Sequence, residues 1–138
     1  MAETCANTTA GVVGATRTLT RALSEADLAL FALVMGDAEL DGEAHLEAEP
    51  RYQRVASPAL LAALLTASAA LHSGQPAAAR FTSAQVRFIA PAYADETVQA
   101  SATVTGVDEP TGALQVRAVC AAEDGRTLAE ADFLVQRD

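Results

Sequence analysis

The hydrophobic pattern is most continuous between Val55 and Ala79, a stretch without Asp, Glu, Lys or Arg. Alanine and leucine dominate it, and both residues favour helices. The leucines recur at helical spacing and alanines occupy the opposite side, so the segment is apolar on every face. A helix that is apolar all round is typical of a protein interior. The pattern therefore predicts one long buried helix, around which the rest of the chain folds.

Local signals mark both ends of this helix. Ser57 suits the N-cap, because its side-chain oxygen can accept a first-turn N–H, and Pro58 suits the first helical position. Gly74 and Pro76 end the helix. His72 falls at its C-terminal end, where a cation favours the helix dipole. The segment is too short and too rich in serine and threonine to cross a bilayer, which needs about 20 apolar residues.

Beyond Pro76 the pattern changes to a twofold period, which is typical of strands half-buried in a sheet. One strand is expected from Phe81 to Ala90, where Pro91 ends it. Three further alternating strands are separated by turns at Glu109–Gly112 and Asp124-Gly125. Their inward-facing residues are expected to be Val98, Ala100, Ala102 and Val104, then Leu114, Val116, Ala118 and Cys120, then Thr127, Ala129, Ala131, Phe133 and Val135.

Ahead of the long helix, the pattern predicts a short strand and a first helix. Thr16 to Arg21 fits a strand, and Ser24–Asp27 resembles a capping box that opens a helix closed by Gly36. We therefore predict an α+β fold, in which an antiparallel sheet in hairpin order wraps around one long buried central helix. Residues 1–15 are expected to form a flexible N-terminal tail, and residues 16–138 a single domain.

Composition narrows the class of partner. The 138 residues include 9 basic and 18 acidic side chains, and the formal charge of −9 argues against nucleic acid or an anionic membrane surface. Two cysteines, Cys5 and Cys120, make no disulfide framework, and the N-terminus shows no signal-peptide pattern, so a cytoplasmic location is expected. We expect Cys120 to be inert core and Cys5 to be free.

Three motifs carry a family resemblance. They are Leu23–Asp27 running on to Gly36-Asp37, then Arg54-Val55-Ala56 before the long helix, and the spacing of phenylalanine, proline, tyrosine and aspartate within Phe88–Asp95. On these motifs the chain resembles, from about Thr16 to Gln136, the MaoC-like family of (R)-specific enoyl-thioester hydratases and dehydratases. The resemblance implies a hotdog fold, no cofactor, and a pocket at the interface of a homodimer or higher homo-oligomer.

The same resemblance points to catalytic candidates. The hydratase motif of the family is Gly-Asp-x-Asn-Pro-x-His, and its Asp and His activate the water that adds to the enoyl double bond. Here Gly36-Asp37 is present, but Gly42 stands where the His is expected, and His45 lies three residues later. Asp37 is thus the first catalytic candidate and His45 the second. The alternatives are an ordinary loop carboxylate and a solvated loop histidine.

A second departure concerns the start of the long helix. The family carries Ala-His-Gly there, and helix N–H groups polarise the thioester carbonyl. This chain has Ala56-Ser57-Pro58, and proline has no N–H to donate. Loss of one such donor typically costs on the order of 10²–10³ in rate. Ser57, Tyr52 and Arg51 are candidate substrate contacts, with a plain N-cap and surface positions as the alternative interpretations.

These departures leave three functions open. The first is a lyase-like enzyme of acyl-thioester or polyketide metabolism with an altered active site. The second is a cofactor-independent cyclase or isomerase of a polyketide-type natural product. The third is a non-catalytic hotdog subunit. Asp37–Glu43 also matches the first seven positions of a calcium-binding EF-hand loop, but Ala48 occupies the twelfth, where a carboxylate is required, so no metal is expected.

Overall fold

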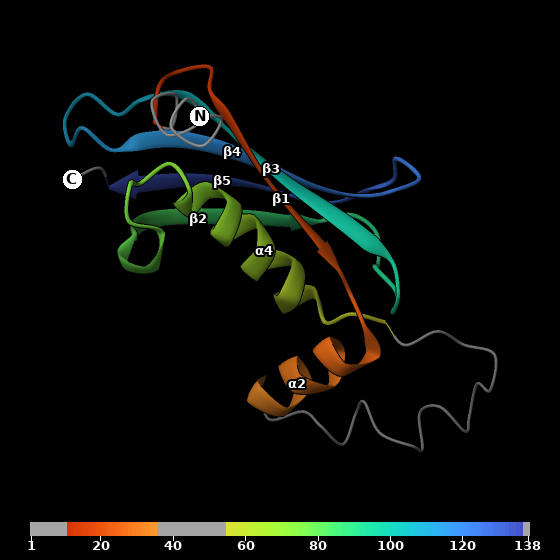
Figure 1. Ribbon diagram of the computed structural model, residues 1–138. Coiled ribbons are helices and arrows are strands. Elements are labelled where there is room, and N and C mark those ends of the chain that lie inside the picture. Colours follow the sequence, from red (N-terminus) through yellow and green to blue (C-terminus); the bar gives the residue numbers. More distant parts are fainter. Residues whose placement is uncertain (1–10, 36–54, 137–138) are drawn as a thin grey trace, which may run out of the picture.

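The computed structural model describes residues 11–35 and 55–136. Their elements, in chain order, are β1 (Thr16–Ala22), α2 (Glu25–Met35), α4 (Pro58–Ala70), the 3-10 helix η2 (Pro76–Ala78), β2 (Arg80–Phe88), β3 (Thr97–Val107), β4 (Leu114–Ala122) and β5 (Thr127–Gln136). The strands form one antiparallel sheet in the order β1-β3-β4-β5-β2. The sheet curves around α4, and α2 lies beyond the first turn of α4 (Figure 1). The α+β prediction is confirmed, but the expected hairpin order is wrong for β2. That strand pairs with β5 instead of β3, because residues 89–96 cross from one edge of the sheet to the strand beside β1 at the other edge.

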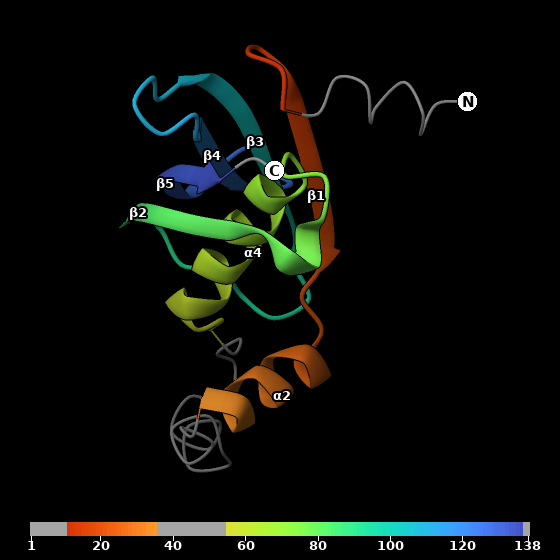
Figure 2. The same cartoon turned by 90° about the vertical axis from the view of Figure 1, so that its left-hand side faces the viewer.

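The core lies between α4 and the inner face of the sheet (Figure 2). Each predicted inward position on β3 and β4 is at most 1% exposed, because alternate residues of a strand point to the same side. On the helix, Leu61 and Leu65 are buried against these strands. Burying a leucine side chain contributes about 1.5–3 kcal/mol, so these two positions are central to the stability of the fold. Small residues such as Ala102 and Ala118 let the helix approach the sheet closely.

One expectation about α4 is wrong for the single chain. The helix is not buried on every side, because Ala63 and Ala67 on its outward face are exposed. The sheet curves around only one side of the helix (Figure 1), and the buried residues of the helix include Leu61 and Leu65. Because the side chain of alanine ends at Cβ, the outward face of the helix exposes little apolar area, and leaving it uncovered costs little free energy.

The segment before β1 contacts the end of α4. The Gly11 N–H donates to Nδ1 of His72 at 2.9 Å, and Nε2 of that ring lies 2.8 Å from the carbonyl oxygen of Ala102. Because Nδ1 accepts a hydrogen bond, the proton sits on Nε2 and the ring is neutral. The prediction that His72 acts as a cation on the helix dipole is therefore wrong. Its ring joins the N-terminal segment to β3.

Residues 14 and 15 continue the pairing of β1 with β3. Gly14 donates its N–H to Val104 at 2.8 Å, and Val104 donates to Ala15 at 3.0 Å. Part of the segment expected to be a tail is thus hydrogen-bonded to the sheet, while residues 1–10 lie outside the described residues. A flexible tail there stays a prediction.

Candidate functional site

The candidate site is organised around the start of α4. The chain enters this helix along the loop between β2 and β3. Val55 forms an isolated antiparallel bridge with Tyr93, and the Ala56 N–H donates to the Ala92 oxygen at 2.8 Å. These contacts hold the residue before Ser57 in place, with Ala56 buried. The first turn of α4 therefore has a fixed position beside this loop.

The hydrogen-bond donors of that first turn are already occupied. Ser57 is the N-cap, as predicted, and its Oγ accepts the Ala59 N–H at 3.2 Å. The Leu60 N–H donates to the Ser57 carbonyl at 2.9 Å, and Pro58 has no N–H. Residues 58–60, all within the described part of the chain, thus offer no N–H to a ligand. These three backbone positions of α4 therefore cannot polarise a carbonyl.

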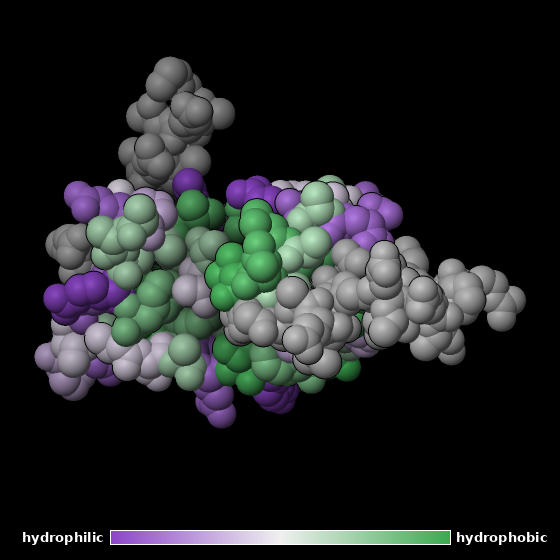
Figure 3. Space-filling model, turned by 90° about the horizontal axis from the view of Figure 1, so that it is seen from below, coloured by the Kyte–Doolittle hydropathy of each residue, from purple (hydrophilic) through white to green (hydrophobic). Residues whose placement is uncertain are grey.

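An apolar pocket of about 330 Å³ lies between α2 and the first turns of α4. Helix α4 contributes Leu60 and Leu64, and α2 contributes Leu30, Phe31 and Val34. Pockets of this size and character typically bind the apolar body of a small molecule. Seen from below, hydrophobic side chains gather on this side of the molecule (Figure 3), where Leu30 and Val34 are 61% and 75% exposed.

Two charged residues, Arg21 and Asp27, border the same pocket. Asp27 serves the predicted capping box, because its Oδ2 accepts the Ser24 N–H at 3.2 Å while its own N–H donates to the Ser24 hydroxyl at 3.1 Å. The Arg21 guanidinium donates to the Thr20 carbonyl at 2.9 Å. A ligand in this pocket thus meets apolar walls and a rim with one cationic and one anionic side chain.

A second hollow of about 240 Å³ lies on the other side of the helix start. Pro58 and Leu61 of α4 border it, together with Phe88 and Ile89 at the end of β2. Both of these β2-end side chains are about half exposed, at 52% and 51%. The two hollows flank the same helical turn.

The structure places only one of the predicted site residues. Ser57 lies at the start of α4 as an N-cap, and contact with a substrate stays a prediction for it. The other candidates, Asp37, His45, Arg51 and Tyr52, lie outside the described residues, as does the EF-hand-like segment Asp37–Glu43. Within residues 11–35 and 55–136, no group of three or more His, Cys, Asp or Glu side chains could hold a metal ion.

Sequence reasoning missed the residues that line the pocket. The apolar pattern of the two helices did not single out Leu30, Val34 or Leu64, because periodicity cannot distinguish a side chain in the core from one bordering a hollow. The available signal was that α2 is apolar on several faces, which is more than one packing surface requires. The thiol of Cys120 is buried, and this burial raises its pKa to about 11, so the thiol stays protonated at neutral pH, as expected for inert core.

A profile of the family described as "MaoC like domain" matches residues 7–124. The chain belongs to this family. No curated protein matches it in sequence. This MaoC-like chain is similar in structure to the unliganded R-hydratase PhaJ1 from Pseudomonas aeruginosa, with a TM-score of 0.76 and 22% identity over 91% of this chain and 83% of that one.

Two further structures are about as similar to the MaoC-like chain. The (R)-hydratase from A. caviae involved in PHA biosynthesis has a TM-score of 0.75 and 20% identity, covering 91% of this chain and 96% of that one. A chain of the ChsH1-ChsH2 complex from Mycobacterium tuberculosis has a TM-score of 0.77 and 22% identity, covering 92% and 98%. These likenesses confirm the hotdog fold. No helix within the described part of the MaoC-like chain is long and apolar enough to span a membrane.

Proposed function

We propose that this MaoC-like chain is a lyase-like enzyme of acyl-thioester or polyketide metabolism, related to the enoyl-thioester hydratases and dehydratases but with an altered active site. The apolar pocket between α2 and α4 carries the proposal, because it suits an acyl chain and opens beside the helix turn that family resemblance associates with the thioester. The matched family and the hydratases that share the fold support the same chemistry.

The alteration lies in how the carbonyl is polarised. Hydration places the water oxygen on one carbon of the enoyl double bond and a proton on the other, so the carbonyl must accept negative charge as the reaction proceeds. With Pro58 in the first turn and the Ala59 and Leu60 N–H groups occupied, the backbone of residues 58–60 cannot supply that stabilisation. Proton transfer by Asp37 is then the main catalytic contribution.

The test is turnover of crotonyl-coenzyme A and of trans-2-octenoyl-coenzyme A by the wild-type chain and by Asp37→Asn. This variant keeps shape and hydrogen bonding but removes the acid, and loss of one acid–base group typically costs 10²–10⁴ in rate. We expect at least a tenfold loss of kcat with KM little changed, and a far smaller loss for His45→Ala. An active Asp37→Asn beside an inactive His45→Ala would instead show that His45 is the essential group.

Two other functions are compatible with the same observations. A cofactor-independent cyclase or isomerase would need only the shape of the apolar pocket and one proton donor. A non-catalytic subunit would need neither, and the closed first turn of α4 favours it. The similar ChsH1-ChsH2 structure is a complex of two proteins, and such a subunit would by analogy bind a catalytically active hotdog protein. Binding of octenoyl-coenzyme A without turnover would favour the cyclase. Absence of binding would favour the non-catalytic subunit.

The proposed assembly is a homodimer through β2. The two edges of the sheet differ in their inner faces. On β1, Arg17 and Arg21 stand opposite the buried Ala102 and Val98, and inward charges protect an edge strand from pairing. On β2, the inner face is instead apolar, formed by Ala84, Val86 and Phe88.

A second observation supports pairing of a partner strand at the β2 edge. Most of its residues are exposed on both faces, unlike those of the central strands. The C-terminal end of β2 also borders the hollow that Phe88 and Ile89 line beside the start of α4. A second copy paired there would cover both apolar surfaces, and small molecules would enter next to the interface.

A further inference from the structure

Both helices that border the apolar pocket begin at the same loop. Residues 91–96 form most of the connection between β2 and β3. The Ala56 N–H donates to this loop at Ala92, and Ser57 then caps α4. The Leu23 N–H donates to its other end, at the Glu96 carbonyl, at 2.8 Å, and Ser24 then caps α2. The loop is therefore a common anchor for α2 and α4.

The loop adopts a conformation that its neighbours must hold. Asp95 has a φ of 69°, in the left-handed region that residues other than glycine adopt at a cost in free energy. Its N–H donates to the Leu23 carbonyl at 2.5 Å, which makes the contact with the start of α2 reciprocal. Such a backbone persists only when surrounding contacts fix it.

Arg126, from the turn between β4 and β5, supplies the outer contacts. Its guanidinium pairs with the Glu96 carboxylate and donates to the Pro91 carbonyl at 3.3 Å, so it reaches both ends of the loop. The other oxygen of Glu96 accepts the Tyr93 N–H at 2.8 Å. Asp124 orients the arginine by accepting its Nε–H at 2.9 Å. One side chain thus connects the β4–β5 turn to the loop.

We propose that Arg126 is a positioning residue for the pocket between α2 and α4. It borders neither hollow and acts through the 91–96 loop, which sets where both helices start. The substrate role of that pocket rests on the proposed function, whereas the hold of Arg126 on the loop does not. Small displacements of this kind matter, because a misplacement of about 1 Å can cost on the order of 10² in rate.

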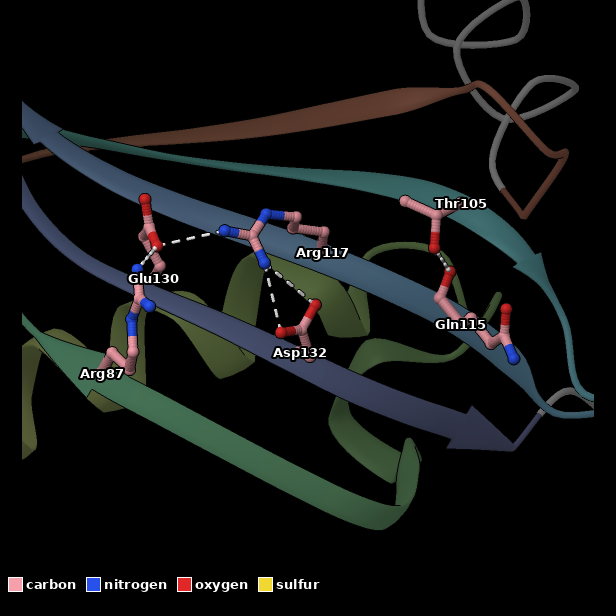
Figure 4. Close-up of polar contacts among 6 residues, drawn as sticks. All are labelled: Arg87, Thr105, Gln115, Arg117, Glu130 and Asp132. Carbon is pink, nitrogen blue, oxygen red and sulfur yellow. Dashed lines mark hydrogen bonds and ion pairs between the residues drawn. The ribbon is translucent and has the colours of Figure 1, made fainter.

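The test compares Arg126→Met with a matched control, Arg117→Met. Arg117 also makes several charged hydrogen bonds, to Asp132 and Glu130, but on the outer face of the sheet away from α4 (Figure 4). The two arginine side chains are 36% and 44% exposed, so the variants should lower the melting temperature by similar amounts. Any difference between the two variants in hydrogen exchange or ligand binding then reflects where each arginine lies in the fold.

The first readout is hydrogen exchange of the backbone amides of Leu23 and Ala56. We expect at least fivefold faster exchange at both in Arg126→Met, less than twofold in Arg117→Met, and an intermediate change in Arg126→Lys, which keeps a charge for Glu96. The second readout is the Kd of octanoyl-coenzyme A, expected to rise at least fivefold only in Arg126→Met.

The outcomes separate the two proposals. Equal exchange at Leu23 and Ala56 in the methionine variants overturns the positioning role of Arg126, whatever the ligand result. Faster exchange confined to Arg126→Met supports that role by itself. If the Kd of octanoyl-coenzyme A then stays unchanged, the pocket is not the acyl site, and the proposed function fails instead.

Discussion

At the scale of single residues, His72 is the side chain whose state the structure defines most sharply. It is 3% exposed, and it accepts from Gly11 while donating to Ala102. Burial lowers its pKa, the hydrogen bond to Ala102 opposes that shift, and the positive charge of Arg17 adds to it. Protonation would place a second hydrogen on Nδ1, against the Gly11 N–H. The folded chain therefore favours the neutral ring.

This state predicts how stability depends on pH. The folded-state pKa lies below 6.5, the value expected when unfolded, so the unfolded chain takes up the proton first as pH falls. The contribution of His72 is thus complete above about pH 6.5 and is lost as pH falls toward its folded-state pKa. Urea unfolding from pH 7.5 to pH 5 should show this loss, and His72→Gln should flatten it while lowering the free energy of unfolding at pH 7.5 by about 1–3 kcal/mol.

The control for that prediction is His45→Ala, because the chain has only 2 histidines. This variant should keep the pH dependence of the wild type. If His72→Gln and the wild type lose stability in parallel between pH 7 and pH 5.5, His72 is not the titrating group.

At the scale of elements, the first turn of α4 carries the proposed alteration of the active site. Proline at the first helical position favours the helix, since its φ is already helical, but it removes a donor. The Ser57 Oγ then accepts the Ala59 N–H, so that donor is occupied as well. The cap that stabilises the helix start thus leaves no free N–H on residues 58–60.

Replacing Pro58 by glycine should restore a donor at that turn. We expect Pro58→Gly to raise hydration of crotonyl-coenzyme A at least tenfold, and to lower the melting temperature slightly because glycine loses more backbone entropy on folding. Pro76→Gly is the matched control, since Pro76 opens the short 3-10 helix η2. Equal turnover in the wild type and both variants would show that the missing N–H does not limit the reaction.

At the scale of the whole molecule, the two sheet edges predict one mode of association. The substitution Val86→Lys places a charge on the apolar inner face of β2. We expect Val86→Lys to convert the dimer to a monomer in light scattering at micromolar concentration. Leu19→Lys, on the inner face of β1, should leave the dimer intact.

Melting curves and circular dichroism of the same samples show whether each variant is folded. A wild-type chain that is monomeric at micromolar concentration contradicts the proposed dimer. So does a folded Val86→Lys variant that remains dimeric, because the interface would then lie elsewhere.

The sequence by itself determined the elements and their buried faces. The twofold period of β3, β4 and β5, the cap at Ser57 and the capping box at Ser24 are local signals, because each depends on residues a few positions apart. The motifs around Leu23 and Phe88–Asp95 were likewise enough to predict the hotdog fold. Burial follows directly from such patterns once the elements pack.

Only the tertiary structure decided what lies between elements. Arg126 and Glu96 are 30 residues apart, and Gly11 and His72 are 61 apart, so no local pattern relates them. The pocket between α2 and α4 and the exposed face of Ala63 and Ala67 depend on how far the sheet curves around the helix. Apolar periodicity reports that a side chain avoids water, but the packing partner that covers it, or leaves it open, is set by the three-dimensional arrangement.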